Sequence, residues 1–228
     1  MYNDKELNGR IDSGIFGSYL WMGIGLLITF GIMYASIYNL QLVQISFTLN
    51  RFSILLILAI AIGMRFIIVK ANAFVLKLVF IGYSAFLGIL LIPIMFAYET
   101  ASIMTLFGAS SAMFIGMSAY GYFTGSNLQG YSKYLFGGIL GIIVMTLLNN
   151  YLFRNNALDI AISIIGLLIF IIYTAVDTQR IKTMLLEAYY EGETELVEKV
   201  KIFGALMLYL DFINMFLYLL SLFGKRRN

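Results

Sequence analysis

The chain of 228 residues contains no histidine, no cysteine and only one proline. Without histidine and cysteine it has no thiol nucleophile, no disulfide, no Ser-His pair and few of the usual ligands of zinc. These absences exclude many classes of enzyme together. We therefore expect a protein that is not an enzyme and that carries no cofactor.

Charge is scarce as well, because Asp, Glu, Lys and Arg together make up 12% of the chain. A soluble domain usually has about 25%, and half of that value does not cover a surface that faces water. Hydrophobic residues make up 61%, and the mean hydropathy is +0.90. The composition predicts an integral membrane protein whose partner is the lipid bilayer. The net charge of +3 is small, and the sequence contains no basic cluster of the kind that binds nucleic acid.

Seven apolar stretches are long enough to cross about 30 Å of hydrocarbon. They run over Gly17–Tyr38, Phe52–Val69, Phe74–Phe96, Ile103–Phe123, Tyr134–Phe153, Leu158–Thr178 and Ile202–Phe223. Several are continuously apolar, which excludes the alternation of a membrane β-barrel. We predict an all-α membrane protein with seven transmembrane helices in a single domain over 1–228, with a polar tail over 1–13 and a basic tail over 224–228.

The polar N-terminus lacks the pattern of a cleaved signal, so we expect the first stretch to remain as a span. If the N-terminus is cytoplasmic, ten basic residues lie inside: Lys5, Arg10, Arg65, Lys70, Lys77, Lys133, Arg180, Lys182, Lys199 and Lys201. Five lie outside: Arg51, Arg154, Lys225, Arg226 and Arg227. The positive-inside rule favours this orientation. We expect a multi-pass protein of the plasma (inner) membrane of a prokaryote.

The last stretch has two possible paths. Its length allows a full crossing, which places the basic C-terminal tail outside. If the stretch instead dips into the membrane and returns, the basic residues divide as thirteen inside and two outside. Charge alone favours the returning path, and the sequence leaves the side of the C-terminus open.

Small residues recur every four positions in two of the stretches. Gly108, Ala112 and Gly116 share one face of the fourth stretch, where Gly121 and Gly125 follow, and Gly137 and Gly141 share one face of the fifth. Because small-xxx-small faces let helices approach closely in lipid, we predict that these faces pack against neighbouring helices.

Asp211 is the most unusual residue, because about ten apolar-rich positions flank it on each side. An aspartate at the centre of a membrane helix costs about 2.5–3.5 kcal/mol on insertion scales, so it usually faces the bundle and has a function. The structural alternative is a carboxyl that only locks helices together, with Tyr209 and Asn214 as possible supports.

Asp177 lies near the end of the sixth stretch and has a simpler explanation, since Arg180 three residues later could pair with it on the same helix. Asp211 is ten residues beyond Lys201, or about 15 Å deeper by helix rise. The two acids therefore meet only if the sixth helix continues past Arg180, or if the last helix tilts or begins outside the bilayer. Two carboxyls that meet in a low dielectric cannot both ionise comfortably, so they would share a proton.

The chain resembles the Bax inhibitor family of membrane proteins. The resemblance rests on Tyr173–Arg180 with Asp177, on Leu208-Tyr209-Leu210-Asp211-Phe212-Ile213-Asn214, and on the seven-segment layout. It implies a central last helix surrounded by six others. It also implies a pH-sensitive Ca²⁺ leak in which Asp177 and Asp211 form a hydrogen-bonded sensor.

The resemblance further implies that Arg65 pairs with the first aspartate as a gate partner. Some relatives have a glutamate in the second helix, but Ser53–Met64 contains no acidic residue. With two carboxylates the expected Ca²⁺ binding is weak, along a route through Asp177 and Asp211.

Two other functions compete with a leak channel. Two aspartates on successive helices also describe an intramembrane aspartyl protease, but presenilin-like enzymes have Gly-x-Gly-Asp and a later proline motif, whereas this chain has Leu208-Tyr209-Leu210-Asp211 and no proline after Pro93. The third possibility is a membrane regulator that binds a protease or a stress-response partner through the charged segment 187–201.

Overall fold

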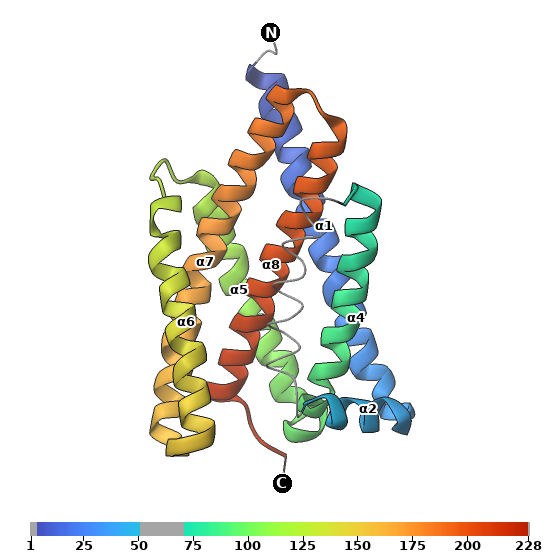
Figure 1. The fold of residues 1–228 in the computed structure, drawn as a ribbon, viewed down its shortest axis with the longest axis vertical. Coiled ribbons are helices and arrows are strands. Elements are labelled where there is room, and N and C mark those ends of the chain that lie inside the picture. The colour runs from blue at the N-terminus through green and yellow to red at the C-terminus, as the bar shows by residue number, and fades with distance from the viewer. Residues whose placement is uncertain (1–3, 51–70, 228) are drawn as a thin grey trace. The chain divides into compact units, whose positions relative to one another are not determined.

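The computed structural model describes residues 4–50 and 71–227. In this part of the chain the regular structure is helical, and one isolated antiparallel bridge joins Tyr98 and Arg226. The long helices are α1 (Asp4–Ala35), α4 (Ala73–Ala97), α5 (Thr100–Phe123), α6 (Ser132–Leu148), α7 (Asn156–Glu191) and α8 (Thr194–Phe223). A shorter helix, α2 (Leu40–Asn50), follows α1 (Figure 1).

Six of the seven predicted stretches correspond to long apolar helices, and all six are long and apolar enough to span a membrane. The seventh, Phe52–Val69, lies outside the described residues. Several helices extend beyond the predicted stretches, because α1 begins at Asp4 and α7 continues to Glu191. Pro93 lies inside α4 near its end. The protein is therefore an all-helical, multi-pass membrane protein.

The chain forms two compact units. Unit 1 comprises Met1–Ala97 and Thr183–Tyr209, with Arg227, and unit 2 comprises Tyr98–Lys182 and Leu210–Arg226, with Asn228. The helix α8 thus contributes its first part to unit 1 and its second part to unit 2. It also has the largest buried share among the six spans, with 61% of its most apolar window buried against 39% for α4 and α7.

Unit 1 is built on α1 and α4, which pack along each other. Tyr209 of α8 completes the core, with its ring edge-to-face against Phe80 and Tyr83 at centroid distances of 5.7 and 6.2 Å. Its hydroxyl lies 2.6 Å from the Thr29 hydroxyl, which is also 2.9 Å from the Ser84 carbonyl. This buried polar cluster is hydrogen-bonded within the unit, as buried polar groups normally are.

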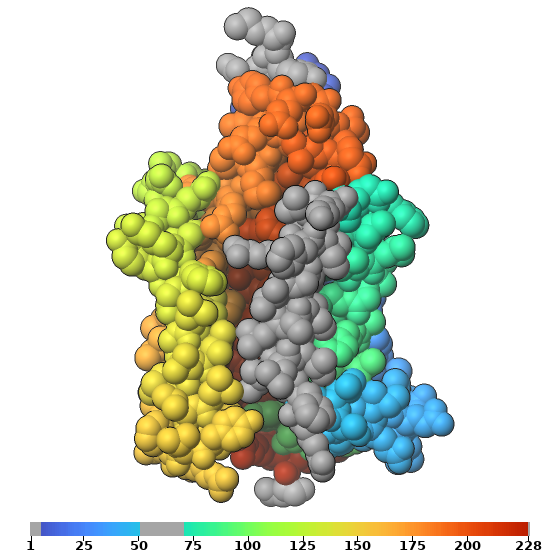
Figure 2. Space-filling view, viewed as in Figure 1, coloured from blue at the N-terminus to red at the C-terminus, as the bar shows by residue number. Residues whose placement is uncertain are grey.

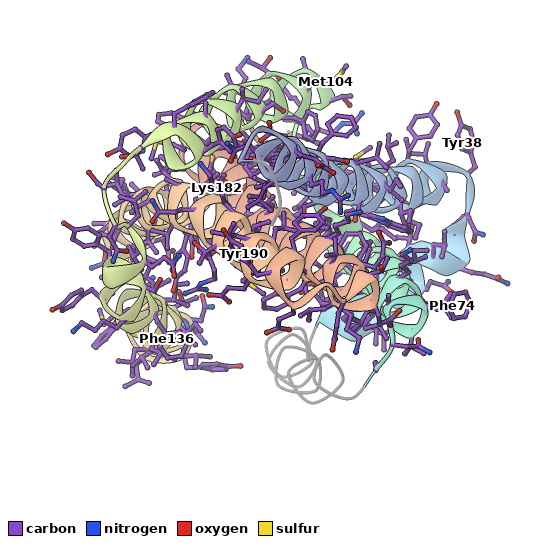
Figure 3. The ribbon with its side chains drawn as sticks, turned by 90° about the horizontal axis from the view of Figure 1, so that it is seen from above. Tyr38, Phe74, Met104, Phe136, Lys182 and Tyr190 are labelled. Atoms are coloured by element: carbon purple, nitrogen blue, oxygen red, sulfur yellow. The ribbon has the colours of Figure 1, made fainter. Side chains whose placement is uncertain are left out.

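Unit 2 contains α5, α6, most of α7 and the end of α8. The ring of Phe212 on α8 packs edge-to-face against Phe107 and Phe114 of α5, at 5.2 and 5.8 Å. The outer side of α6 carries exposed apolar side chains, and this helix forms the yellow surface in Figure 2. Met104 of α5 and Phe136 of α6 point outward in Figure 3. In a membrane protein such faces contact lipid.

The predicted packing through small residues is wrong for most of the positions named. No neighbour within the described chain lies within 4 Å of where a Cβ would stand at Gly108, Gly116, Gly137 or Gly141. The prediction is confirmed at Gly121, the next glycine of the fourth stretch, where a Cβ would collide with the backbone of Ala175 on α7. At the other four positions the four-residue spacing was detected correctly, but on helix sides that face outward.

The last stretch is one continuous helix of 30 residues, about 45 Å long at 1.5 Å per residue. This length supports the full crossing and not the returning path. After Phe223 the backbone is tied to the start of α5, because the N–H of Glu99 donates to the Lys225 carbonyl at 2.9 Å and the N–H of Lys225 donates to the Ser102 hydroxyl at 3.0 Å.

Candidate functional site

Asp177 lies on α7 in unit 2 and is 5% exposed. Its Oδ1 is 3.4 Å from Nη1 of Arg180, and the other terminal nitrogen of Arg180 donates to the Ser132 hydroxyl at 2.9 Å. The Arg180 side chain is 35% exposed. The interpretation of an ion pair on one helix is therefore correct, and the pair joins a buried carboxyl to a half-exposed cation.

Asp211 lies on α8 in the same unit and is 3% exposed. The charges of both Asp177 and Arg180 act on it. Its Oδ2 has no hydrogen-bond partner among the residues that the structure describes. A buried acceptor without a partner costs about 1–3 kcal/mol, and more when it is charged. Asp211 is therefore a costly residue in this core, which distinguishes it from the polar cluster of unit 1.

The two acids lie on helices that both extend further than their apolar cores. The α7 helix continues past Arg180 to Glu191, where Gly192 with φ 72° ends it, and α8 begins at Thr194. A left-handed residue directly after a helix is a common stop, and glycine adopts it without strain. The sequence analysis required a sixth helix that continues past Arg180 if the two acids were to meet, and α7 does continue past this residue.

The other predicted site residues are placed differently. Tyr209 bonds to Thr29 in unit 1, and the Asn214 amide donates to the Leu210 carbonyl of its own helix at 2.8 Å. Neither forms a hydrogen bond with Asp211 within the described chain. Arg65 lies outside the described residues. In residues 4–50 and 71–227, no three acidic side chains gather as a metal site.

Ser118 is a residue that sequence reasoning missed. It lies on the buried face of α5 between Phe114, which contacts α8, and Gly121, which contacts α7. Its hydroxyl and Asp211 Oδ2 are the two buried side-chain atoms without a hydrogen-bond partner in the part of the chain described. A serine in an apolar helix usually bonds to its own backbone, so only the tertiary contacts show that Ser118 is unusual.

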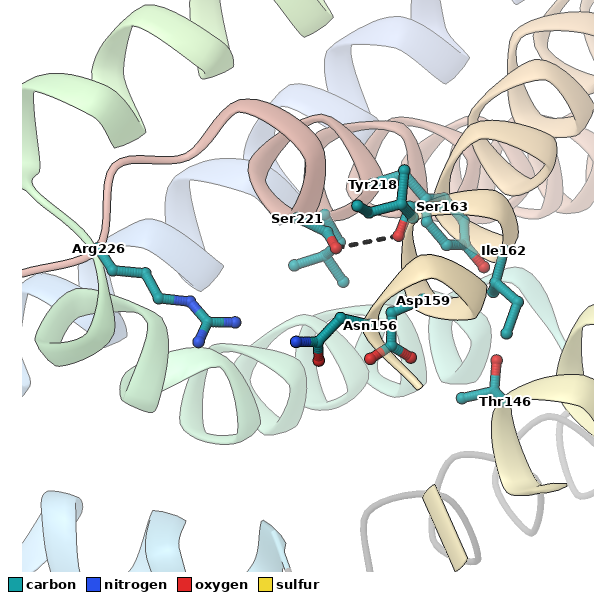
Figure 4. Close-up of a pocket in the computed structure, with 10 residues that line it drawn as sticks. Thr146, Asn156, Asp159, Ile162, Ser163, Tyr218, Ser221 and Arg226 are labelled. Atoms are coloured by element: carbon teal, nitrogen blue, oxygen red, sulfur yellow. Dashed lines mark hydrogen bonds between the residues drawn. The ribbon is translucent and has the colours of Figure 1, made fainter. Parts of the chain in front are cut away.

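A pocket of about 530 Å³ opens at the end of unit 2 where α7 begins and α8 ends (Figure 4). Its polar lining includes Thr146, Asn156, Asp159, Ser163, Ser221 and Arg226. The hydroxyls of Ser163 and Ser221 lie 2.9 Å apart and join α7 to α8. The pocket brings together one acid, one basic residue and several neutral oxygen atoms, and no sequence motif predicts it.

Comparison with known proteins gives a consistent result. Residues 12–228 match the family model described as "Inhibitor of apoptosis-promoting Bax1". The chain is 40% identical over 212 residues to the inner membrane protein YbhL of Escherichia coli strain K12, covering 92% of this chain and 90% of the relative. It is 38% identical to an uncharacterized protein of Borreliella burgdorferi, covering 91% and 89%, and 34% identical to one of Deinococcus radiodurans, covering 92% and 89%.

The family match covers nearly the whole chain, and its coverage includes both aspartates, most of α1 and the other five apolar helices described above. The matched relatives are of similar length, since alignments of more than 200 residues cover about nine-tenths of each. The resemblance first recognised from the two aspartate motifs is confirmed, and this chain belongs to the Bax inhibitor family of membrane proteins.

Proposed function

We propose that this protein is a pH-sensitive calcium leak channel gated by protonation of Asp177 and Asp211. The observation that carries the proposal is the buried Asp211 carboxyl, which has an oxygen without a partner in the described chain and on which the charge of Asp177 acts. A chain that only needed a helix lock would satisfy that oxygen, as the Thr29–Tyr209 cluster does. The cost of an unsatisfied buried acid is more easily explained by a function.

The proposed mechanism follows from charge. Two ionised carboxylates close together in a low dielectric repel each other, and Arg180 neutralises one of the two charges. Gain or loss of a proton changes the attraction between α7 and α8 at this point. This change opens or closes the route for the ion between the two helices. Ionised carboxylates are also hard oxygen ligands suited to Ca²⁺, and two of them give weak, transient binding. Arg65 is included as gate partner on the strength of the family resemblance alone.

We place this channel in the inner membrane of a bacterium, with a cytoplasmic N-terminus. Support for the membrane comes from the inner membrane protein YbhL, to which the chain is 40% identical. Support for the orientation comes from the distribution of basic residues.

The test is Ca²⁺ flux into liposomes between about pH 6 and about pH 8, the range in which a coupled carboxyl pair can titrate. Asp177→Asn and Asp211→Asn should each reduce the pH dependence of the flux. Glu191→Gln, on the exposed end of α7, is the matched control and should behave as the parent does. Parent-like pH dependence in both aspartate variants would remove the pair from the mechanism.

A second candidate function is a membrane regulator that binds a partner protein through 187–201. Two glutamates of this segment are engaged within unit 1, because Glu195 accepts the N–H of Ala73 at 2.6 Å and Glu198 pairs with Lys77 at 2.9 Å. Glu187 and Glu191 are exposed, beside Tyr190, whose side chain is 69% exposed.

These exposed residues are the part of the segment that is available to a basic partner. Replacing Glu187, Glu191 and Glu193 by glutamine should abolish co-purification of such a partner, whereas Asp177→Asn should not. Retention of the partner by the triple variant would contradict this second function.

A further inference from the structure

The faces of α7 and α8 that meet in unit 2 carry a continuous line of side chains from the pocket to the acid pair. At the pocket end the Ser163 and Ser221 hydroxyls lie 2.9 Å apart. Next along α8 comes Tyr218, then Asn214, then Asp211, at the spacing of three or four residues that places side chains on one helix face. The distance from Ser221 to Asp211 along α8 is about 15 Å by helix rise.

Three aromatic rings of α7 and α8 contact one another in series along this line. Tyr218, which lines the pocket, lies 6.0 Å from Phe170 with ring planes 31° apart. Phe170 lies 6.2 Å from Tyr173 with planes 34° apart. The charges of Asp177 and Asp211 act on Tyr173. The stack therefore begins at the wall of the pocket and ends beside the acids.

Tyr218 can occupy this position because α7 has a glycine opposite it. A Cβ at Gly166 would collide with the Tyr218 ring, so any other residue would displace the ring. Gly166 is buried, and Tyr218 is half-buried. The ring is thus held against α7 by close contact, and separating a pair of stacked rings has only a modest cost beyond the lost buried area. A barrier of this kind closes firmly but can open at moderate cost.

The two ends of the site differ in their access to water. At the Arg180 end, Asp177 contacts a half-exposed cation. At the pocket end, the polar residues Asp159, Asn156 and Arg226 line an open cavity, and Tyr218, the first ring of the stack, forms part of its wall (Figure 4). Hydrophobic constrictions stop ions by excluding water from a short length of the path.

We propose that the stack of Tyr218, Phe170 and Tyr173 is the barrier between the pocket and the acid pair, and that Gly166 is the residue that lets Tyr218 close it. The pocket is a water-filled vestibule for hydrated cations. When Tyr218 moves, this vestibule becomes continuous with the acid pair. The claim that this barrier controls the passage of Ca²⁺ rests on the proposed leak function. The claim that the barrier exists does not, because a closed aromatic barrier limits any small cation.

The absence of native cysteine makes a direct test possible. Ser221→Cys places a thiol at the pocket, and Thr174→Cys places one beyond Phe170, where Thr174 is fully buried and bonds to the Phe170 carbonyl. A membrane-impermeant cationic thiosulfonate is added on the vesicle face where Ser221→Cys reacts. We expect the Thr174→Cys thiol to react at least about tenfold more slowly.

Opening the barrier should remove this difference. Tyr218→Ala, combined with Thr174→Cys, should raise its reaction rate towards that of Ser221→Cys. Gly166→Ala should do the same with Tyr218 intact, which guards against loss of folding in the first variant. Gly137→Ala, at a position with space for a Cβ, is the matched control and should leave the rate unchanged.

Equal rates for the two thiols in the parent, or no acceleration by either barrier variant, would overturn the proposal. Ca²⁺ flux is measured on the same vesicles, where Tyr218→Ala should increase the leak at every pH. If the thiol rates behave as expected and no variant passes Ca²⁺, the barrier stands and the calcium leak function fails.

Discussion

The hydroxyl of Tyr209 and the carboxyl of Asp211 lie two residues apart on α8, yet they differ in their hydrogen bonding. Both residues are buried, at 0% and 3% exposure. The Tyr209 hydroxyl has a partner at 2.6 Å in Thr29, whereas Asp211 Oδ2 has none within the described chain. The first pattern is that of a group that stabilises its unit, and the second is that of a group kept at a cost. The comparison predicts that Tyr209 controls stability and Asp211 controls activity.

The largest expected effect is on the side of Tyr209. Tyr209→Ala removes a buried ring that packs against Phe80 and Tyr83, and should lower the free energy of unfolding by about 3–5 kcal/mol. Unfolding in detergent micelles measures it. Tyr190→Ala, at an exposed position of α7, is the control and should change stability by less than about 0.5 kcal/mol. A Tyr209→Ala variant with the same free energy of unfolding as the parent would contradict the stabilising role of Tyr209.

The next effect concerns the contact that brings α5 against α7 beside the acid pair. Gly121→Ala places a methyl group against the Ala175 backbone and should cost about 1–3 kcal/mol. Gly116→Ala on the same helix meets open space and should be neutral or stabilising by up to about 1 kcal/mol, because alanine favours helix. Equal effects of the two substitutions in thermal unfolding would show that the close approach is not important.

A smaller difference in stability is expected between losing a buried hydroxyl that has a hydrogen-bond partner and losing one that has none in the described structure. Thr29→Val removes the hydroxyl that bonds to the buried Tyr209 hydroxyl and should cost on the order of 1 kcal/mol. Ser118→Ala removes a hydroxyl that has no partner in the described structure and should not lower stability. Denaturant titration of both variants decides between them, and a larger loss for Ser118→Ala would contradict the assignment.

The smallest effect is at the ion pairs of unit 1. Glu198 lies 2.9 Å from Lys77 and 2.8 Å from Lys201, and all three side chains are partly exposed. Glu198→Gln should cost at most about 1 kcal/mol, and less in high salt, since exposed pairs are screened. Comparing stability in low and high salt checks this, and a loss that salt does not reduce would indicate a packing role instead.

Sequence reasoning found Asp211 because an acid in the middle of an apolar stretch is visible in composition. It found Asp177 mainly through the family resemblance, since Arg180 beside it suggested an ordinary membrane edge. The ion pair is present, but α7 continues past it as a helix to Glu191, and Lys182 is accommodated by the Tyr122 carbonyl at 3.2 Å and by its ring. The polar residues past Thr178 are thus part of the helix and not its end.

The remaining site residues leave no local signal. Gly166 resembles any other glycine in an apolar helix, and only the Tyr218 ring that lies against it gives it a role. The same holds for Ser118, whose lack of a partner depends on which helices surround it. Spacing predicted close contact at Gly108 and Gly116, where the helix faces outward, because periodicity identifies a face but not what covers it.

The most direct measurement is the pH dependence of Ca²⁺ flux in the double variant Asp177→Asn with Asp211→Asn, compared with each single variant in liposomes. If the two acids act as one proton-sharing unit, their effects are not additive, and the double variant should be no flatter with pH than the single variants. Single variants that each remove a separate part of the pH dependence, with the double variant losing the sum, would show independent acids. A double variant with the full pH dependence of the parent would contradict the account.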